Sequence, residues 1–289
     1  IGTDERSVTQ LAFDHLVDRG FHRFAYVGFF DHNYSERRCE LFQRLAADDG
    51  SDCFVYETPP ALRKAASWEQ VQHGLVSSDD LRDWLHQLPK PIGLMACNDV
   101  RGQQVLNACR EVGVAVPEDI AVVGVDDDEV LCELSDPPLS SVAPDVFRIG
   151  YEAAALADQL MAGDAPPTGP TFIEARGVVT RQSTDVTAID DRNIAAAVRF
   201  IRDHACDGIG VDDVVDAVPL SRSTLERRFR REMHRSPHAH ILRVRIDRVK
   251  QLLRETDLPL TRVADLAGFD HAEYLNVAFK RETGQTPGA

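Results

Sequence analysis

Hydrophobic positions in the first 125 residues follow two alternating periods. Short apolar runs occupy residues 24–28, 53–56, 92–96 and 120–125, and their length and composition predict strands. Between them, apolar residues recur every three to four positions, which predicts helices over residues 8–18, 36–47, 78–87 and 100–112. Strands that alternate with helices indicate a parallel sheet covered on both faces. The sequence therefore begins with a predicted α/β domain, in which residues 1–4 form the end of a further strand.

From residue 211 the pattern is helical throughout. A short valine-rich helix over residues 211–218 is followed by a second helix over residues 222–233, for which Ser221 is the expected N-cap. A long helix over residues 238–254 comes next. The pattern of short helix, turn and second helix then repeats, with its turn at Gly268. This pattern predicts an all-α domain with two helix-turn-helix motifs.

The second helix of each motif presents a polar face that suits DNA. On the first of these helices, the side opposite Leu225 and Phe229 is basic and bears hydroxyl groups. Its candidates for DNA contact are Ser223, Thr224, Arg227, Arg228, Arg230 and Arg231. The last helix turns outward the candidates Glu273, Asn276, Val277 and Lys280. Because arginines and hydroxyls bind phosphates and base edges, both helices are predicted to contact double-stranded DNA.

The net charge of the chain and the distribution of that charge lead to different predictions about a nucleic-acid partner. A formal net charge of −15 argues against a nucleic-acid partner. Residues 188–289, however, hold 17 Lys and Arg against 16 Asp and Glu, so the acidic excess lies before them. Residues 222–254 alone hold 11 basic and 3 acidic residues. A charge run is usually just a solvated face, but this one coincides with the predicted recognition helix, which favours DNA contact.

This second part resembles a known family. The residues that support the resemblance are Leu225-x-Arg227-x-Phe229, Ser236-Pro237, Arg245, Gly268-Phe269, Phe279-Lys280 and Thr286-Pro287. Their order is similar to that of the AraC-type DNA-binding domain. The resemblance implies two recognition helices that enter successive major grooves, with the long helix setting their separation. Val277 departs from the polar or basic residue frequent in relatives, which implies weaker base reading or contact with a thymine methyl group.

The first part contains a different set of matching segments. They are Arg38-x-x-x-Phe42, Asn98-Asp99, Val116-Pro117-Glu118-Asp119-Ile120, Val123-Gly124-Val125-Asp126-Asp127 and Pro138-Leu139-Ser140-Ser141-Val142. They resemble the sugar-binding domain of the LacI/GalR regulators, which is related to periplasmic binding proteins. Residues 1–184 are expected to form the second of its two lobes and the return into the first, with most of the first lobe absent and the chain truncated. A linker over residues 185–191 and a DNA-binding domain over residues 192–289 are expected to follow.

The resemblance implies a sugar site. Arg38, Trp68, Asn98 and Asp126 match positions that relatives use for a sugar, and Asp4 matches a hinge-side position. A sugar needs hydrogen-bond donors and carboxylates for its hydroxyl groups and an aromatic face for its C–H side. Asn98 and Asp126 each follow a predicted strand, and α/β folds open their clefts at strand carboxyl ends. Without the resemblance, Asn98 would be a helix N-cap, Asp126 a turn residue, Arg38 a surface arginine and Trp68 part of the core.

Patterns for other chemistry are missing. The six cysteines form no C-x-x-C motif and several lie in apolar runs, which is typical of reduced thiols in the cytoplasm. The acidic run Asp126-Asp127-Asp128-Glu129 lacks the spacing of a calcium loop. We find no metalloprotease, serine-hydrolase or phosphate-loop motif, no membrane span and no signal peptide. We therefore expect no metal, no cofactor and no enzymatic activity.

Together the two resemblances imply a cytoplasmic transcriptional activator that responds to a sugar. The implied partners are an operator in double-stranded DNA, a small sugar effector with a pentose, D-xylose, favoured, RNA polymerase, and a second copy of the chain in a homodimer. Two alternatives stay open at this point. One is a sugar-binding protein of a transport system, and the other is a regulator that responds to a different sugar.

Overall fold

The computed structural model describes residues 1–29, 32–56, 79–185, 189, 191–256 and 258–287. The chain divides into a first unit, Ile1–Val186, and a second unit, Thr187–Ala289. The boundary falls inside the predicted linker of residues 185–191. Trp68, one of the predicted sugar-site residues, lies outside the described residues.

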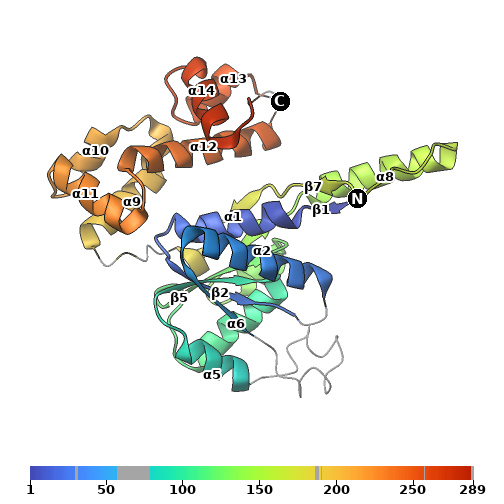
Figure 1. Ribbon diagram of the computed structural model, residues 1–289, viewed down its shortest axis with the longest axis horizontal. Coiled ribbons are helices and arrows are strands. Elements are labelled where there is room, and N and C mark those ends of the chain that lie inside the picture. The colour runs from blue at the N-terminus through green and yellow to red at the C-terminus, as the bar shows by residue number, and fades with distance from the viewer. Residues whose placement is uncertain (30–31, 57–78, 186–188, 190, 257, 288–289) are drawn as a thin grey trace. The chain divides into compact units, whose positions relative to one another are not determined.

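A six-stranded sheet organises the first unit (Figure 1). Its strand order is β3-β2-β4-β5-β6-β8. The strands are β2 Arg23–Val27, β3 Asp52–Tyr56, β4 Ile92–Ala96, β5 Ile120–Val125, β6 Ser140–Ala143 and β8 Gly177–Val179. All neighbours pair in parallel except β6 and β8, which are antiparallel. The predicted parallel sheet is confirmed for β2 to β5, and the antiparallel edge strand is an addition.

Helices cover both faces of this sheet (Figure 1). One face carries α1, Glu5–Val17, and α2, Asn33–Asp49, and the other carries α5, Asp79–Gln87, and α6, Asp99–Glu111. A shorter helix, α7, spans Glu129–Leu134. On the α1 and α2 side the core is aromatic, with the ring centroids of Phe13 and Phe24 4.6 Å apart. On the α5 and α6 side it is aliphatic and includes Leu85, Leu94 and Val105.

A further helix and a small sheet complete the first unit. Helix α8, Val146–Ala162, extends away from the six-stranded sheet (Figure 1). None of its residues is fully buried, and Phe147 and Met161 are 83% and 80% exposed. Strand β1, Gly2–Thr3, pairs in parallel with β7, Phe172–Ile173. The predicted strand end at residues 1–4 is thus present.

The second unit is entirely helical. Its helices are α9 Arg192–His204, α10 Val211–Asp216, α11 Arg222–Met233, α12 Pro237–Glu255, α13 Leu260–Leu266 and α14 Ala272–Thr283. A short 3₁₀ turn, η2 Ala205–Asp207, follows α9, whereas another, η1 Gln182–Thr184, lies at the end of the first unit. The predicted pair of helix-turn-helix motifs and the long helix between them are confirmed. Helix α9, whose buried Ile194, Val198 and Ile201 complete the first motif, was not predicted.

Two hydrophobic cores lie in the second unit, and α12 contributes to both. The first core gathers Ile194, Val214, Leu225, Phe229 and Ile241, with further apolar side chains from the same helices. The second core lies in the second helix-turn-helix motif and gathers side chains of α12, α13 and α14. Its members include Leu242, Val249, Val263, Leu275 and Phe279. One long helix therefore joins two separately packed motifs.

No helix in the described part of the chain is long and apolar enough to span a membrane. All six cysteines are described, and each is a free thiol. Burial raises the pKa of Cys97 to about 11 and that of Cys109 to about 12, so both are neutral thiols near pH 7.

Candidate functional site

The strand order fixes where a ligand cleft opens in the first unit. From β2 the chain crosses to β3 at one edge and then returns to β4 on the opposite side of β2. Connections that leave in opposite directions make a topological switch point, and α/β sheets bind ligands outside the strand carboxyl ends at such points. Arg38 lies on α2, which follows β2, and Asn98 lies two residues after the end of β4. Both predicted residues therefore lie at the switch point.

Arg38 is buried and only partly satisfied. Its side chain is 5% exposed, and its Nε donates to Oε2 of Glu5 at 2.5 Å. Its Nη1 donates to the carbonyl oxygen of Cys97, and the guanidinium lies 5.1 Å from the ring centroid of Tyr34. Among the described residues, no hydrogen bond uses Nη2. Burial disfavours its charge, but Glu5 and Asp126 outweigh that cost and raise the pKa of Arg38.

Asn98 has the structural role expected without the resemblance, and it also contacts the cluster. It is the N-cap of α6, and its Oδ1 accepts from the backbone N–H of Arg101 at 2.9 Å. Its Nδ2 donates to the hydroxyl of Tyr34 at 3.4 Å. The amide group is thereby fixed by the helix while its NH₂ end faces the polar cluster.

Asp126 follows β5 and completes the cluster. Its side chain is exposed to solvent, yet surrounding protein atoms desolvate the carboxyl. Burial raises the pKa of Asp126 to about 6; Arg38 opposes that rise, whereas Glu5 and Asp128 add to it. Within the described part of the chain, no group donates a hydrogen bond to this carboxylate.

The structure adds two residues to the predicted set and gives one predicted residue, Asp4, a different set of contacts. Glu5 and Tyr34 belong to the cluster of Arg38, Asn98 and Asp126, although no sequence motif indicated them. Tyr34 lies four residues before Arg38 on α2, so the helical i, i+4 relation is the signal that could have found it. Asp4 is the N-cap of α1, where its Oδ1 accepts from the N–H of Arg6 at 3.0 Å. Among the described residues, no hydrogen bond joins Asp4 to the cluster.

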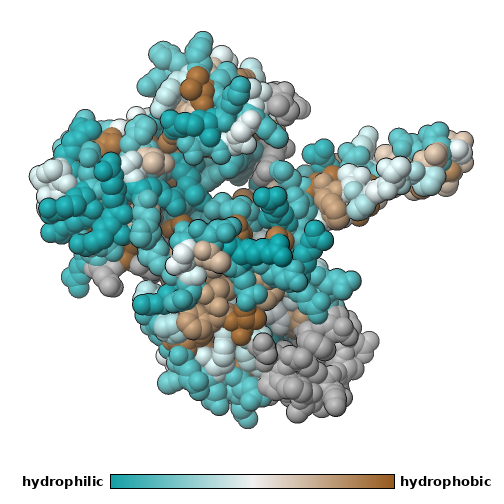
Figure 2. Space-filling model, viewed as in Figure 1, coloured by the Kyte–Doolittle hydropathy of each residue, from teal (hydrophilic) through white to brown (hydrophobic). Residues whose placement is uncertain are grey.

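In the second unit, α11 separates a buried face from a basic face as predicted. Leu225, Phe229 and Met233 are buried in the first core. Ser223, Arg227, Arg230 and Arg231 are exposed, and Thr224 is half-buried. The surface over α11 is largely hydrophilic in Figure 2. Ser221 occupies the N-cap position, but its hydroxyl donates to Oγ1 of Thr224 at 2.9 Å rather than accepting from a backbone N–H.

The guanidinium of Arg228 forms an ion pair with an aspartate of the same unit. Its Nη1 lies 3.2 Å from Oδ2 of Asp191, and Nη2 of Arg231 lies 3.9 Å from the same oxygen. Asp191 is also the N-cap of α9, where its Oδ1 accepts from the N–H of Asn193 at 3.1 Å. One aspartate thus anchors the start of α9 to the basic helix.

Helix α14 presents a less basic surface. Glu273, Val277 and Lys280 are exposed, Val277 by 66%, and Asn276 is half-buried. Leu275 and Phe279 lie in the second core on the opposite side. The apolar Val277 at the centre of this surface can contact a thymine methyl group but offers no hydrogen bond to a base edge.

Arg245, near the middle of α12, contacts both motifs. Its Nε donates to the carbonyl oxygen of Ala205 at 2.7 Å, and its Nη2 donates to that of Ile209 at 2.6 Å. Its guanidinium also lies 5.8 Å from the ring centroid of Phe269, in the turn of the second motif. These contacts join α12 to the segment between α9 and α10 and to the turn after α13.

Comparison with known proteins assigns both units to families. Residues 13–184 match the periplasmic binding protein-like domain, and residues 214–289 match a helix-turn-helix domain. The xylose operon regulatory protein of Escherichia coli (strain K12) is 33% identical over 293 residues, which cover 99% of this chain and 72% of that protein. The chain belongs to the xylose operon regulatory protein family. The regulator of the same description from Haemophilus influenzae is 33% identical over 99% of the chain and 73% of its own length.

Solved structures agree with this family. A structure of the xylose-binding transcription activator XylR matches with a TM-score of 0.56 and 32% identity over 99% of this chain and 74% of that chain. A LacI-type regulator from Alkaliphilus metalliredigens, in complex with D-xylulofuranose, matches with a TM-score of 0.52 and 18% identity over 63% of this chain and 64% of that chain, and supports the fold alone. This chain is therefore a sugar-responsive, DNA-binding transcription regulator. Its relatives are regulators rather than enzymes, as expected from the sequence.

Proposed function

We propose that this regulator binds a pentose, D-xylose in the first place, at the cluster of Arg38, Glu5, Tyr34, Asn98 and Asp126. The supporting observation is that Asp126 is a desolvated carboxylate without a hydrogen bond among the described residues, close to the positive charge of buried Arg38. A hydroxyl group that donates to Asp126 and accepts from Nη2 of Arg38 satisfies both. Two relatives, a xylose operon regulatory protein and a xylose-binding transcription activator, support the choice of sugar.

Titration calorimetry of the whole chain against D-xylose, D-ribose, L-arabinose and D-glucose tests this proposal. We expect D-xylose to bind, and Asp126→Asn to weaken binding about tenfold or more, because a hydrogen bond to a charged acceptor contributes roughly 1.5–3 kcal/mol. Arg38→Gln is expected to weaken binding as well. Its matched control is Arg110→Gln, because Arg110 is an exposed arginine whose ion pair with Asp136 is 3.4 Å long.

Each outcome of the titration bears on a different part of the proposal. Unchanged affinity in both Asp126→Asn and Arg38→Gln would place the sugar elsewhere. Tighter binding of another sugar in the panel would replace D-xylose as the effector, which is the alternative left open by the sequence. The other alternative, a transport protein, lacks support because residues 214–289 match a helix-turn-helix family.

We further propose that α11 and α14 contact an operator in double-stranded DNA, and that Arg227 reads a base. Arg227 is exposed on the side of α11 opposite Leu225 and Phe229, where a recognition helix faces the major groove. An arginine that binds the edge of a guanine contributes about 1–3 kcal/mol to discrimination. We expect Arg227→Ala to weaken binding to the operator by more than tenfold and binding to a scrambled duplex much less. Equal losses on both duplexes would leave Arg227 as a phosphate contact only.

The remaining proposals concern how the regulator works in the cell. We propose that it acts in the cytoplasm, as a homodimer that activates transcription through contact with RNA polymerase, and that the sugar favours the DNA-binding state. Light scattering with and without sugar tests the dimer, and transcription from purified components tests activation. A monomer at operator-binding concentrations, or sugar-dependent repression, would contradict the respective proposal.

A further inference from the structure

The backbone of the aspartate loop, residues 126–128, departs from ordinary conformations. Asp126 and Asp127 have φ angles of 110° and 50°. Both lie in the left-handed half of the φ range, which residues other than glycine rarely adopt. Such residues persist only where the surrounding structure over-determines them, and they gather at ligand clamps. Contacts outside the loop must therefore hold Asp126 in place.

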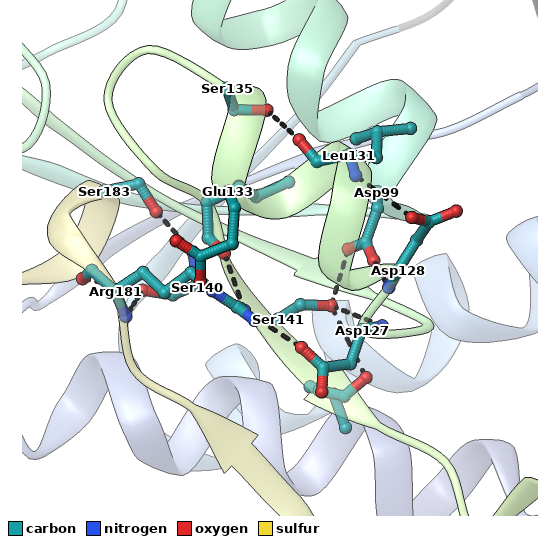
Figure 3. Close-up of polar contacts among 12 residues, drawn as sticks. Asp99, Asp127, Asp128, Leu131, Glu133, Ser135, Ser140, Ser141, Arg181 and Ser183 are labelled. Carbon is teal, nitrogen blue, oxygen red and sulfur yellow. Dashed lines mark hydrogen bonds and ion pairs between the residues drawn. The ribbon is translucent and has the colours of Figure 1, made fainter.

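Backbone hydrogen bonds supply part of this restraint. Three successive N–H groups of the loop are all bound, and each has an acceptor on β6 or α6. In order, they donate to the carbonyl oxygen of Val142 at 3.0 Å, Oγ of Ser141 at 3.0 Å and Oδ2 of Asp99 at 2.9 Å. Figure 3 shows the side chains of Asp99 and Ser141 directed at the loop. These bonds attach the loop to the sheet but not to the end of the first unit.

Arg181 provides that second attachment. Its side chain is 10% exposed, and its guanidinium lies between the carboxylates of Asp127 and Glu133 (Figure 3). Nη1 is 2.9 Å from Oδ1 of Asp127, and Nε is 2.6 Å from Oε1 of Glu133. Nη1 also donates to the carbonyl oxygen of Leu139 at 3.1 Å. One fork therefore joins the aspartate loop, α7 and the start of β6.

Arg181 begins the exit segment, residues 181–184, after which the first unit ends at Val186. This segment is fixed at both ends by hydrogen bonds. Ser140 Oγ accepts from the N–H of Arg181 at 2.7 Å, and Ser183 Oγ donates to the carbonyl oxygen of Val122 at 2.6 Å. Thr184 Oγ1 lies 2.8 Å from Nε2 of His15. The exit segment is thus a rigid part of the sheet up to the residues that lead to the second unit.

We propose that Arg181 is a positioning residue that holds the aspartate loop and the exit segment as one body, so that sugar bound at Asp126 restrains the chain where it leaves the first unit. The inference rests on the proposed sugar site. Arg181 touches no ligand in this scheme and acts through Asp127. Without the fork, Asp126 relaxes from its left-handed conformation, which weakens sugar binding, and the exit segment no longer senses the loop. Arg181 therefore affects both sugar affinity and the coupling of sugar to DNA.

The experiment is a double-mutant cycle in the whole chain with Arg181→Gln, Asp127→Asn and the double variant. Calorimetry with D-xylose is expected to give about a tenfold loss in each single variant and little further loss in the double, since directly interacting residues are not additive. Arg181→Lys keeps the charge but cannot bind both carboxylates as a fork, so it should recover only part of the affinity. Arg110→Gln is again the matched control and should leave affinity unchanged.

Two further measurements separate a positioning role from general destabilisation. The ratio of operator dissociation constants without and with D-xylose should fall toward one in Arg181→Gln, while urea unfolding shows that the first unit stays folded. Amide hydrogen exchange at residues 126–128, measured without sugar, should become faster in Arg181→Gln but not in Arg110→Gln.

The outcomes distinguish this inference from the proposed function. If Asp126→Asn abolishes sugar binding while the Arg181 variants keep wild-type sugar affinity and wild-type amide exchange, the proposed role of Arg181 is wrong and the proposed sugar site stands. If neither Asp126→Asn nor Arg38→Gln affects binding, the proposed site fails, and exchange at residues 126–128 still decides whether Arg181 clamps the loop. Additive losses in the cycle would also overturn the proposal.

Discussion

Asp99 places a titratable group in the interior of the first unit. It is 2% exposed, its Oδ1 accepts from Oγ of Ser141 at 2.5 Å, and its Oδ2 accepts from the N–H of Asp128 at 2.9 Å. Burial raises the pKa of Asp99 to about 7, and the two hydrogen bonds reduce that rise without cancelling it. A group that supports the aspartate loop therefore changes charge near neutral pH.

This pKa predicts how the stability of the first unit depends on pH. The native pKa of about 7 is above the unfolded value of about 4, so the contribution is fully present below about pH 4 and is lost as pH rises through about 7. In Asp99→Asn, the free energy of unfolding should depend less on pH between about 4 and 7. Its amide can still accept from Asp128 and donate to Ser141. Urea unfolding followed by tryptophan fluorescence measures the stability of the first unit at each pH, because both tryptophans, Trp68 and Trp84, belong to that unit.

Asp126 requires a control in this measurement. Burial raises the pKa of its carboxyl to about 6, so it contributes to the profile with the same sign. In Asp126→Asn, the free energy of unfolding should lose its pH dependence below about pH 6 but keep the dependence near pH 7 that Asp99 causes. A profile for Asp99→Asn that parallels the wild type would mean that Asp99 does not titrate in this range.

Single residues also mark how far the sequence can predict the site. Arg38, Asn98 and Asp126 were found because a family resemblance singles out their positions, and the structure brings them to one switch point. Glu5 was not found because its role depends on packing of α1 against α2, which brings residues 33 positions apart into contact. Local periodicity contains no information about such pairs. The role of each residue in binding stays a prediction.

Besides the packing of the first core, ion pairs from the start of α9 link that helix to α11. Asp191 caps α9 and faces Arg228 and Arg231. Its side chain is 13% exposed, whereas that of Arg228 is 37% exposed, so the pair contributes only about 0.2–1 kcal/mol to stability. Its larger effect is electrostatic, because Asp191 neutralises part of the charge that α11 offers to phosphates.

We therefore predict that Asp191→Asn strengthens non-specific DNA binding. Asparagine preserves the cap of α9, but Arg228 and Arg231 lose their carboxylate and become available to the DNA backbone. Affinity for a scrambled duplex should rise a few-fold, and its salt dependence should steepen by about 0.9 for each additional phosphate that the arginines neutralise. Fluorescence anisotropy at several salt concentrations measures both.

Asp203→Asn is the matched control for this variant. Asp203 lies near the other end of α9, is exposed and pairs with Arg202, so the change in net charge is the same. It should alter the salt dependence less than Asp191→Asn does. Weaker binding of Asp191→Asn to scrambled DNA would show that Asp191 orders α11 for DNA rather than shielding it.

At the level of elements, the sequence predicted those whose apolar pattern is long or continuous. Strands β2, β4 and β5 are buried runs, β3 is a partly buried apolar run, and α11 and α12 have regular apolar stripes, so their pattern alone identifies them. Strand β6 has only four residues, two of them serine, and β8 has three. Their antiparallel pairing joins residues more than 30 positions apart, and the bond from the N–H of Arg181 to Oγ of Ser140 lies next to it; the local pattern records neither. Helix α8 was missed although its amphipathic pattern is present.

Across the whole molecule, charge is divided unequally between the units. Residues 1–186 hold 15 Lys and Arg against 31 Asp and Glu, whereas residues 187–289 hold 17 against 16. The first unit therefore repels the DNA that the second unit binds, over a range set by the Debye length of about 10 Å at 0.1 M salt. Two hydrophobic cores lie entirely within the second unit, so it has the packing required to fold alone.

This asymmetry predicts that the isolated second unit, Thr187–Ala289, binds a scrambled duplex more tightly than the whole chain at low salt. The difference should be several-fold at about 50 mM salt and should shrink as salt approaches about 300 mM, because screening removes the repulsion. Anisotropy titrations of both proteins on one duplex measure it. A difference that persists unchanged at high salt would point to a steric or conformational cause instead.

The attachment of the exit segment to β5 and β6 also sets an order of events during translation. The sheet of the first unit is complete once residues up to Thr184 have left the ribosome, since these residues close its hydrogen bonds. Residues 185–289, about a hundred residues, are synthesised after Thr184, which takes roughly 5 to 20 seconds. During that interval the first unit can fold and meet its effector before a DNA-binding surface exists. A newly made regulator can therefore reach its first operator with its sugar site already occupied or empty according to the sugar present in the cell.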